Sequence, residues 1–173
     1  MQLWQHIENH IEQVTGAVFH IDDNRGVAGG CINASFQIAD GGHRYFIKTN
    51  HSRYAAMFEA EAEGLLEMAS SNTIKVPRPV CYGEHAEQCY IVMEYLDFGG
   101  GGDNALFGQQ LAAMHQQTTD SFGWRMDNTI GSTPQPNNQH QDWIEFWRKE
   151  RLGLPGDLCC PRYTRTYRLA CGR

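Results

Sequence analysis

The chemistry of this chain centres on two residues of opposite charge, Lys48 and Glu61. In the segment 54–68, a helical period of about 3.6 residues places Glu61 in an apolar stripe that consists of Tyr54, Met57, Phe58, Leu65 and Met68. A carboxylate in such a stripe is costly to bury unless a cation or a hydrogen-bond donor meets it. Lys48 ends the strand-like run 45–48 just before this helix, so we predict an ion pair between Lys48 and Glu61. A lysine held in this way can bind the phosphates of ATP, which makes phosphoryl transfer the first functional hypothesis.

Each of the two charged residues also has an ordinary structural interpretation. Lys48 could be a solvated lysine at a strand end, and Glu61 could reach water from the margin of the stripe. The neighbouring Glu59 and Glu63 fall on the opposite side of the helix. If the functional interpretation is right, Glu61 should be the most buried of the three carboxylates.

A glycine-rich segment, 26–33 (GVAGGCIN), lies between two strand-like segments. The backbone N–H groups of such a loop can arch over the phosphates of a nucleotide. The segment is not a Walker A loop, because no GK[ST] follows, and it is not a dinucleotide-binding fingerprint, because a strand follows it and not a helix. Alone it could be an ordinary loop between strands, but its spacing from Lys48 and Glu61 favours a phosphate-binding loop.

The elements that position these residues can be predicted from periodicity and turn residues. A first helix carries apolar residues at helical spacing and ends at Gly16. Strands are expected over 18–21, 31–39 and 44–49, and the last two should form a hairpin through the turn 40–42.

The chain beyond the Glu61 helix continues the same pattern. Two prolines in 73–84 predict an edge strand or a linker, and 89–96 is an apolar run typical of a buried strand. The four glycines 99–102 predict a hinge. Two further helices are expected, one capped by Asn104 and one after the polar loop 131–141.

This order of elements predicts an α+β fold of the protein-kinase-like class. We expect an N-terminal, ATP-binding lobe of antiparallel sheet and helices over 1–97, a glycine-rich hinge over 98–103, and the first part of a helical C-terminal lobe over 104–153. The segment 154–173 turns basic, cysteine-rich and aperiodic. We predict that this segment is a disordered tail.

Several features resemble functional motifs but are interpreted as structural or accidental. The triplet 97–99 spells the metal-binding DFG of protein kinases, but it stands at the hinge, before any catalytic loop could occur. The triplet 156–158 echoes part of an HGD loop without the histidine. His115 is expected to pack beside Met114, although a catalytic histidine is the alternative. Core positions, with an aromatic substrate platform as the alternative, are expected for Trp143 and Trp147.

Composition excludes several classes of function. The formal charge of −6 and the pI near 5.7 argue against a surface for nucleic acid or anionic membranes. The sequence shows no signal peptide and no apolar run of spanning length, so a soluble, cytoplasmic protein is expected. The cysteines form no zinc-binding or disulfide pattern, and Cys81 and Cys89 are expected to be buried in strands.

The chain resembles the fructosamine kinase (ketosamine 3-kinase) family, within the aminoglycoside and choline kinase-like group. The segment DNTIGSTPQPN (127–137) is the most specific match. The other matching segments, which together cover nearly all of 1–153, are GGCINASF (29–36), YFIK (45–48), MFEAEAEGL (57–65), VPRPVCYGE (76–84), IVMEYL (91–96), FGQQLAAMH (107–115) and DWIEFWRKERLG (142–153).

The resemblance implies ATP-dependent phosphorylation of a sugar hydroxyl on a ketosamine, such as a fructose-lysine adduct, as a repair of glycation. ATP and Mg²⁺ would be the cofactors, and the partner would be a small or protein-bound ketosamine. Lys48 would contact the nucleotide phosphates and Glu61 would hold it. The phosphates would be covered by Gly29, Gly30, Cys31 and Asn33, and the adenine would be held by the backbone of Met93, Glu94 and Tyr95.

The sequence also departs from the family pattern. Family members carry an HGDLW-type catalytic loop and a later DPA-type aspartate that holds magnesium, and neither motif occurs here. No residue is therefore assigned the catalytic or the metal-binding role. We expect a truncated or frameshifted member of the family, and a native but divergent tail after Gly153 is the alternative.

Two other functions stay open at this point. The chain could be a non-catalytic nucleotide-binding or interaction fragment, or a kinase for another small amine or an aminoglycoside. Exposed helices after the hinge would also favour self-association.

Overall fold

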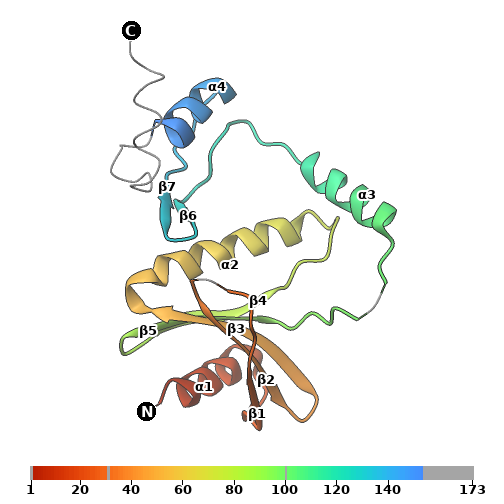
Figure 1. Cartoon of the computed structure of the whole chain (residues 1–173), viewed down its shortest axis with the longest axis vertical. Helices are drawn as coiled ribbons and strands as arrows, with labels where there is room; N and C mark the ends of the chain where they lie inside the picture. The colour runs from red at the N-terminus through yellow and green to blue at the C-terminus, as the bar shows by residue number, and fades with distance from the viewer. Residues whose placement is uncertain (1, 31, 100, 154–173) are drawn as a thin grey trace. The chain divides into compact units, whose positions relative to one another are not determined.

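The computed structural model describes residues 2–30, 32–99 and 101–153. The chain divides into two compact units, of which the first ends at Thr118 and the second begins at Thr119 (Figure 1). The predicted hinge 98–103 falls within the first unit, and the assignment of lobes remains a prediction. Cys31 and the predicted tail 154–173 lie outside the described residues.

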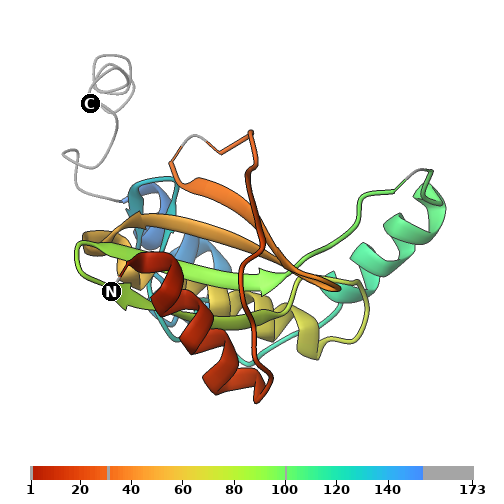
Figure 2. The ribbon, with the colours of Figure 1, turned by 90° about the horizontal axis from the view of Figure 1, so that it is seen from below.

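Strands of the first unit form a five-stranded sheet within the described residues, and each neighbouring pair is antiparallel (Figures 1 and 2). The order across the sheet is β1-β2-β3-β5-β4. Because β4 lies at an edge, the two prolines of its segment are tolerated there, as predicted. The strands are β1 (Asp23–Gly26), β2 (Ala34–Asp40), β3 (His43–His51), β4 (Pro79–His85) and β5 (Gln88–Glu94).

Helices cover both faces of the sheet: α1 (Leu3–Thr15) lies on one face and α2 (Ala55–Ser70) on the other (Figure 2). The central strand β5 shows the consequence, because residues 89–93 are all buried. Tyr90 and Val92 join the core under α1, whereas Cys89, Ile91 and Met93 join the core under α2. Burial on both faces explains why this strand reads as a continuous apolar run.

The hairpin β2–β3 and the end of α1 follow the prediction. Gly16 takes the left-handed conformation (φ 72°) and donates its N–H to the carbonyl of Glu12 at 2.8 Å, which terminates α1. Residues 41–42 form the turn between β2 and β3. β2 begins at Ala34, three residues later than expected.

The strand predicted over 18–21 is wrong. These residues lie outside regular structure because carboxylates, not a neighbouring strand, accept their backbone N–H groups: His20 donates to Asp40 (3.1 Å) and Ile21 to the buried Glu8 (2.6 Å). Phe19 is buried, and the strand begins only at Asp23.

The helix α3 (Asn104–His115) ends the first unit. Its N-cap is Asp103 and not Asn104, since Asp103 Oδ1 accepts the N–H groups of Ala105 (2.8 Å) and Leu106 (3.2 Å). His115 is exposed, so its predicted packing beside Met114 is wrong.

The second unit holds a short hairpin, β6 (Asn128–Ile130) and β7 (Thr133–Gln135), and then α4 (Trp143–Phe146), which continues as a π-helical turn over Trp147–Leu152. The predicted polar loop 131–141 thus contains one strand of a hairpin. Phe146 is buried, but Trp143 and Trp147 are 51% and 45% exposed, so their predicted core positions are wrong. The centroids of the two tryptophan rings lie 5.5 Å apart, and the rings are tilted by 35° to one another.

The hairpin of the second unit is held by side chains that follow it. The amide of the buried Asn137 donates to the carbonyl of Met126 (3.0 Å) and to Asn128 Oδ1 (3.1 Å). Its Oδ1 accepts from Arg151 Nη2 at 2.5 Å. Glu150, also buried, binds His140 Nε2 at 2.8 Å, so the π-helical turn is tied to the segment after the hairpin.

Candidate functional site

The ammonium group of Lys48 and the carboxylate of Glu61 form the predicted ion pair. Lys48 lies on β3 and Glu61 on α2, and the Nζ–Oε1 distance is 2.5 Å. The two side chains are 28% and 25% exposed, so the pair is partly shielded from water but remains reachable. The free-energy cost of removing one partner of a pair with this exposure is expected to lie between the costs for exposed and for fully buried pairs.

Packing of α2 on the sheet sets the position of Glu61. Phe58 and Ala62 of α2 are buried against the sheet, where they contact the core that contains Cys89, Ile91 and Met93 of β5. Glu59 is exposed, as predicted, whereas Glu63 is half-buried like Glu61. The predicted ranking of the three carboxylates is therefore confirmed for Glu59 only.

The apolar stripe around Glu61 is shorter than predicted. Tyr54, Met57 and Leu65 pack against the core under α2, but Met68 is 37% exposed. The buried part of the stripe thus ends about one helical turn after Glu61.

Two glycines allow the glycine-rich segment to fold tightly. Gly29 has a φ of 129°, a conformation that side chains disfavour. A Cβ atom on Gly30 would lie 2.9 Å from the carbonyl oxygen of Asn33, so a larger residue would push the segment open. The N–H of Val27 donates to the carbonyl of Ser35 at 2.8 Å and closes the base of the segment.

The strand register brings this segment to Lys48. Ser35 on β2 lies opposite Lys48 on β3. Asn50, two residues after Lys48, donates from Nδ2 to Asn33 Oδ1 (2.7 Å) and to the carbonyl of Ile32 (3.2 Å). Sequence reasoning missed Asn50, although residues i and i+2 of a strand share a face and this position was a usable signal.

The end of β5, predicted to hold adenine through its backbone, is tied to neighbouring segments. Met93 is buried. The N–H of Glu94 donates to the carbonyl of Arg78 at 2.8 Å, and its carboxylate pairs with Lys75 at 3.2 Å. Because that N–H is engaged, an adenine ring would have to use other backbone groups of 93–95.

An ion pair that the sequence did not predict lies beside this strand end. The guanidinium of Arg44 binds both carboxylate oxygens of Asp97 and stacks over the ring of Tyr95, 4.6 Å from its centroid. The hydrogen bond with Asp97 raises the pKa of Arg44 above its ordinary value. Asp97 thus has a structural partner, which agrees with the interpretation of the DFG triplet as accidental.

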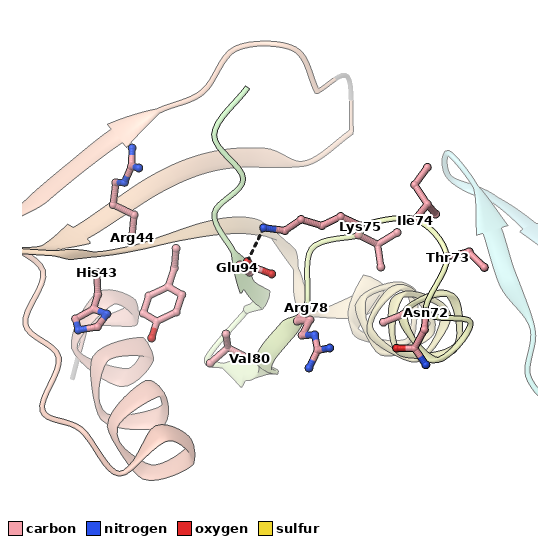
Figure 3. A pocket seen from close by; sticks show the side chains of 12 residues that line it. His43, Arg44, Asn72, Thr73, Ile74, Lys75, Arg78, Val80 and Glu94 are labelled. Carbon is pink, nitrogen blue, oxygen red and sulfur yellow. Dashed lines mark ion pairs between the residues drawn. The ribbon is translucent and has the colours of Figure 1, made fainter. Parts of the chain in front are cut away.

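The first unit also has a pocket with a volume of about 680 Å³. The side chains that line it are drawn in Figure 3. Its lining comes from the start of β3, the loop after α2 and the end of β5, and includes Arg44, Lys75, Arg78 and Glu94. Lys48 and Glu61 are not among its lining residues, all of which belong to the described part of the chain. The pocket is therefore distinct from the Lys48–Glu61 pair, which lies on the face of the sheet that carries α2.

The fructosamine kinase family model matches residues 3–170. The chain belongs to the fructosamine kinase family. The family match confirms the resemblance inferred from the motifs, and it extends past Gly153 into the segment whose composition differs.

Fructosamine kinase relatives share extensive sequence with this chain. A probable ketoamine kinase of Synechocystis is 47% identical over 153 residues, which cover 87% of this chain and 52% of the relative. A chloroplastic protein-ribulosamine 3-kinase of Arabidopsis thaliana is 46% identical over 141 residues, which cover 79% of this chain and 43% of the relative. The chain thus spans about half the length of these curated relatives.

Solved structures confirm the α+β, protein-kinase-like fold class. The crystal structure of a putative fructosamine-3-kinase from Haemophilus somnus matches with a TM-score of 0.80 at 27% identity, over 88% of this chain and 54% of that one. A second putative fructosamine-3-kinase, from Thermobifida fusca, matches with a TM-score of 0.66 at 25% identity, over 84% and 50% of the two chains.

Two negative findings apply to the part of the chain that the structure describes. Residues 2–30, 32–99 and 101–153 include no helix that is both long and apolar enough to span a membrane. In the same residues, no three His, Cys, Asp or Glu side chains are grouped so that they could hold a metal ion.

Proposed function

We propose that the protein acts in the ATP-dependent phosphorylation of ketosamines and that the first unit is its nucleotide-binding part. The observation that carries this proposal is the Lys48–Glu61 ion pair, 2.5 Å long, beside a tightly folded glycine segment in a chain of the fructosamine kinase family. The names of the relatives, ketoamine kinase and ribulosamine 3-kinase, support a ketosamine as the acceptor.

The proposed roles follow from charge and reach. The Lys48 ammonium would donate hydrogen bonds to phosphate oxygens, while Glu61 holds the side chain in place. Backbone N–H groups near Gly29, Gly30 and Asn33 would cover the same phosphates. Cys31 keeps the same predicted role, but it lies outside the described residues.

Adenine binding is assigned to the backbone of 93–95, where β5 ends. Met93 and Ile91 of β5 both lie on the face of the sheet that carries α2, and Lys48 on β3 lies opposite Ile91. The adenine and phosphate groups of one nucleotide would therefore follow β5 from its end toward Lys48.

Magnesium, which the family implies, is not matched by residues of the described part of the chain. No group of three potential ligands is present there, and the sequence lacks the DPA-type motif. We derive no catalytic step through a metal ion. In the proposed reaction, the residues of the described part hold and orient the nucleotide.

A titration of the chain with ATP tests the proposal. Lys48→Ala should weaken ATP binding at least tenfold, because a charge-assisted hydrogen bond to phosphate is lost. The matched control is Lys149→Ala, which removes a lysine that pairs with Glu145 in the second unit and should change ATP affinity less than twofold. Equal ATP affinity in the wild-type chain and Lys48→Ala would refute the assignment of Lys48.

A further inference from the structure

Asn50 joins the glycine-rich segment to the strand that carries Lys48. Successive residues of a strand alternate between faces, so Asn50 and Lys48 lie on the same face of β3. The Asn50 amide donates to Asn33 Oδ1 at 2.7 Å and to the carbonyl of Ile32 at 3.2 Å. One side chain thus reaches two successive residues of the segment that is proposed to cover the phosphates.

These contacts begin where the backbone ladder between β2 and β3 ends. The last paired residues at this end of the ladder are Ala34 and Thr49. Beyond them, Asn50 is the next residue of β3, and its amide takes over the connection to Asn33 and Ile32. The Asn50 side chain therefore continues the connection between the two strands by two residues, Asn33 and Ile32. These residues belong to the turn in which Gly30 lies close to the carbonyl of Asn33.

The other end of the Asn50 amide is also fixed. Its Oδ1 accepts the N–H of His51 at 2.7 Å. An amide that accepts on one side must present its NH₂ group on the other, so the donor is directed toward the glycine-rich segment. Asparagine supplies both functions, whereas aspartate would place a carboxylate oxygen against two acceptors.

We propose that Asn50 is a positioning residue that sets the spacing between the glycine-rich segment and the Lys48 ammonium, so that both contact the same phosphates. This inference rests on the proposed function. In this role Asn50 does not contact the nucleotide itself. Its effect reaches the phosphates through the backbone of Ile32 and Asn33.

The test compares ATP with adenosine as ligands of the full chain. If Asn50 positions the phosphate-binding groups, Asn50→Ala should weaken ATP binding about tenfold and leave adenosine binding within twofold. Asn50→Asp should weaken ATP binding further, because it opposes two acceptors and adds a negative charge near the phosphates. The matched control is Asn9→Asp, an exposed position on α1, which covers the opposite face of the sheet.

Hydrogen exchange without nucleotide measures the connection itself. Amide protection in 27–30 and 32–33 should fall at least fivefold in Asn50→Ala and stay unchanged in Asn9→Asp. A residue that only stabilised the fold would lower protection across β2 and β3 and weaken ATP and adenosine equally, and that result would overturn the inference.

The two proposals fail in different ways. If the wild-type chain binds adenosine but gains no affinity from the phosphates of ATP, the proposed function fails, and the inference about Asn50 fails with it. If the wild-type chain prefers ATP and Asn50→Ala keeps the same preference, the phosphate site stands and only the role of Asn50 is refuted.

Discussion

Removing one partner of the Lys48–Glu61 pair should destabilise the first unit, and removing both should cost less than the sum. In Lys48→Met or Glu61→Gln, the remaining charge is mostly buried without its counter-ion, since the side chains are only 28% and 25% exposed. Exposed pairs contribute about 0–1 kcal/mol, whereas breaking a buried pair costs about 3–5 kcal/mol. For this intermediate exposure we expect about 1.5 kcal/mol for each single substitution.

The double substitution leaves two neutral side chains of similar size. We expect it to cost about 1 kcal/mol, which gives a coupling free energy of about 2 kcal/mol, within the usual range for residues in contact. Hydrogen exchange of β3 and β5 peptides at increasing urea concentration measures the stability of the first unit separately from the second. The control Glu59→Gln changes an exposed carboxylate of the same helix and should cost less than about 0.5 kcal/mol.

Two results would contradict this reasoning. A coupling free energy below about 0.5 kcal/mol would mean that the ion pair is no stronger than an ordinary surface pair. Equal effects of Glu59→Gln and Glu61→Gln would mean that the position of Glu61 in the apolar stripe has no energetic consequence.

Three further predictions concern thiols, pH and turnover. Burial raises the pKa of the Cys81 thiol to about 12 and also raises the pKa of Cys89, so at pH 8 both thiols should react slowly with iodoacetamide. Cys31 should react faster, and ATP should protect it. Equal labelling of all three cysteines would argue against the phosphate loop. The hydrogen bond with His140 lowers the pKa of Glu150 in the folded state. The stabilising contribution of the Glu150 carboxylate is therefore complete above its unfolded pKa of about 4.3 and is lost as the pH falls through the lower pKa of the folded state. Over that pH range, amide protection of 128–135 should drop in the wild type but not in Glu150→Gln. The 173-residue polypeptide by itself should show no ketosamine-dependent ATP turnover. Joining a family-like segment after Gly153 should supply this turnover. Turnover by the polypeptide itself would mean that other carboxylates replace the HGDLW-type and DPA-type motifs.

Local patterns were sufficient for much of the first unit. The apolar stripe around Glu61 indicated that a cation must meet it, and Lys48 does so. The turn 41–42 and the continuous apolar run of β5 indicated the hairpin and the buried central strand. In each case the evidence lies within about fifteen residues of sequence.

The errors come from hydrogen bonds between side chains and backbone or other side chains, which local patterns do not encode. His20 and Ile21 were expected in a strand, but Asp40 and Glu8 accept their N–H groups, and periodicity carries no information about such partners. The connection from Asn50 to Asn33 spans seventeen residues and depends on the strand register.

The hairpin of the second unit was missed for a related reason. Strands of three residues are too short to show alternation. Their support comes from Asn137 and Arg151, which follow them in the chain. Besides its backbone pairing, the hairpin thus depends on side-chain hydrogen bonds that sequence periodicity does not reveal.

A crystal structure of the chain with a non-hydrolysable ATP analogue tests the central claim most directly. We predict that Lys48 Nζ lies about 3 Å from a phosphate oxygen while Glu61 remains within hydrogen-bond reach of Lys48, with the glycine-rich segment over the same phosphates. The adenine should lie against the backbone of 93–95. A nucleotide whose phosphates instead occupy the basic pocket of Lys75 and Arg78, away from Lys48, would contradict the account.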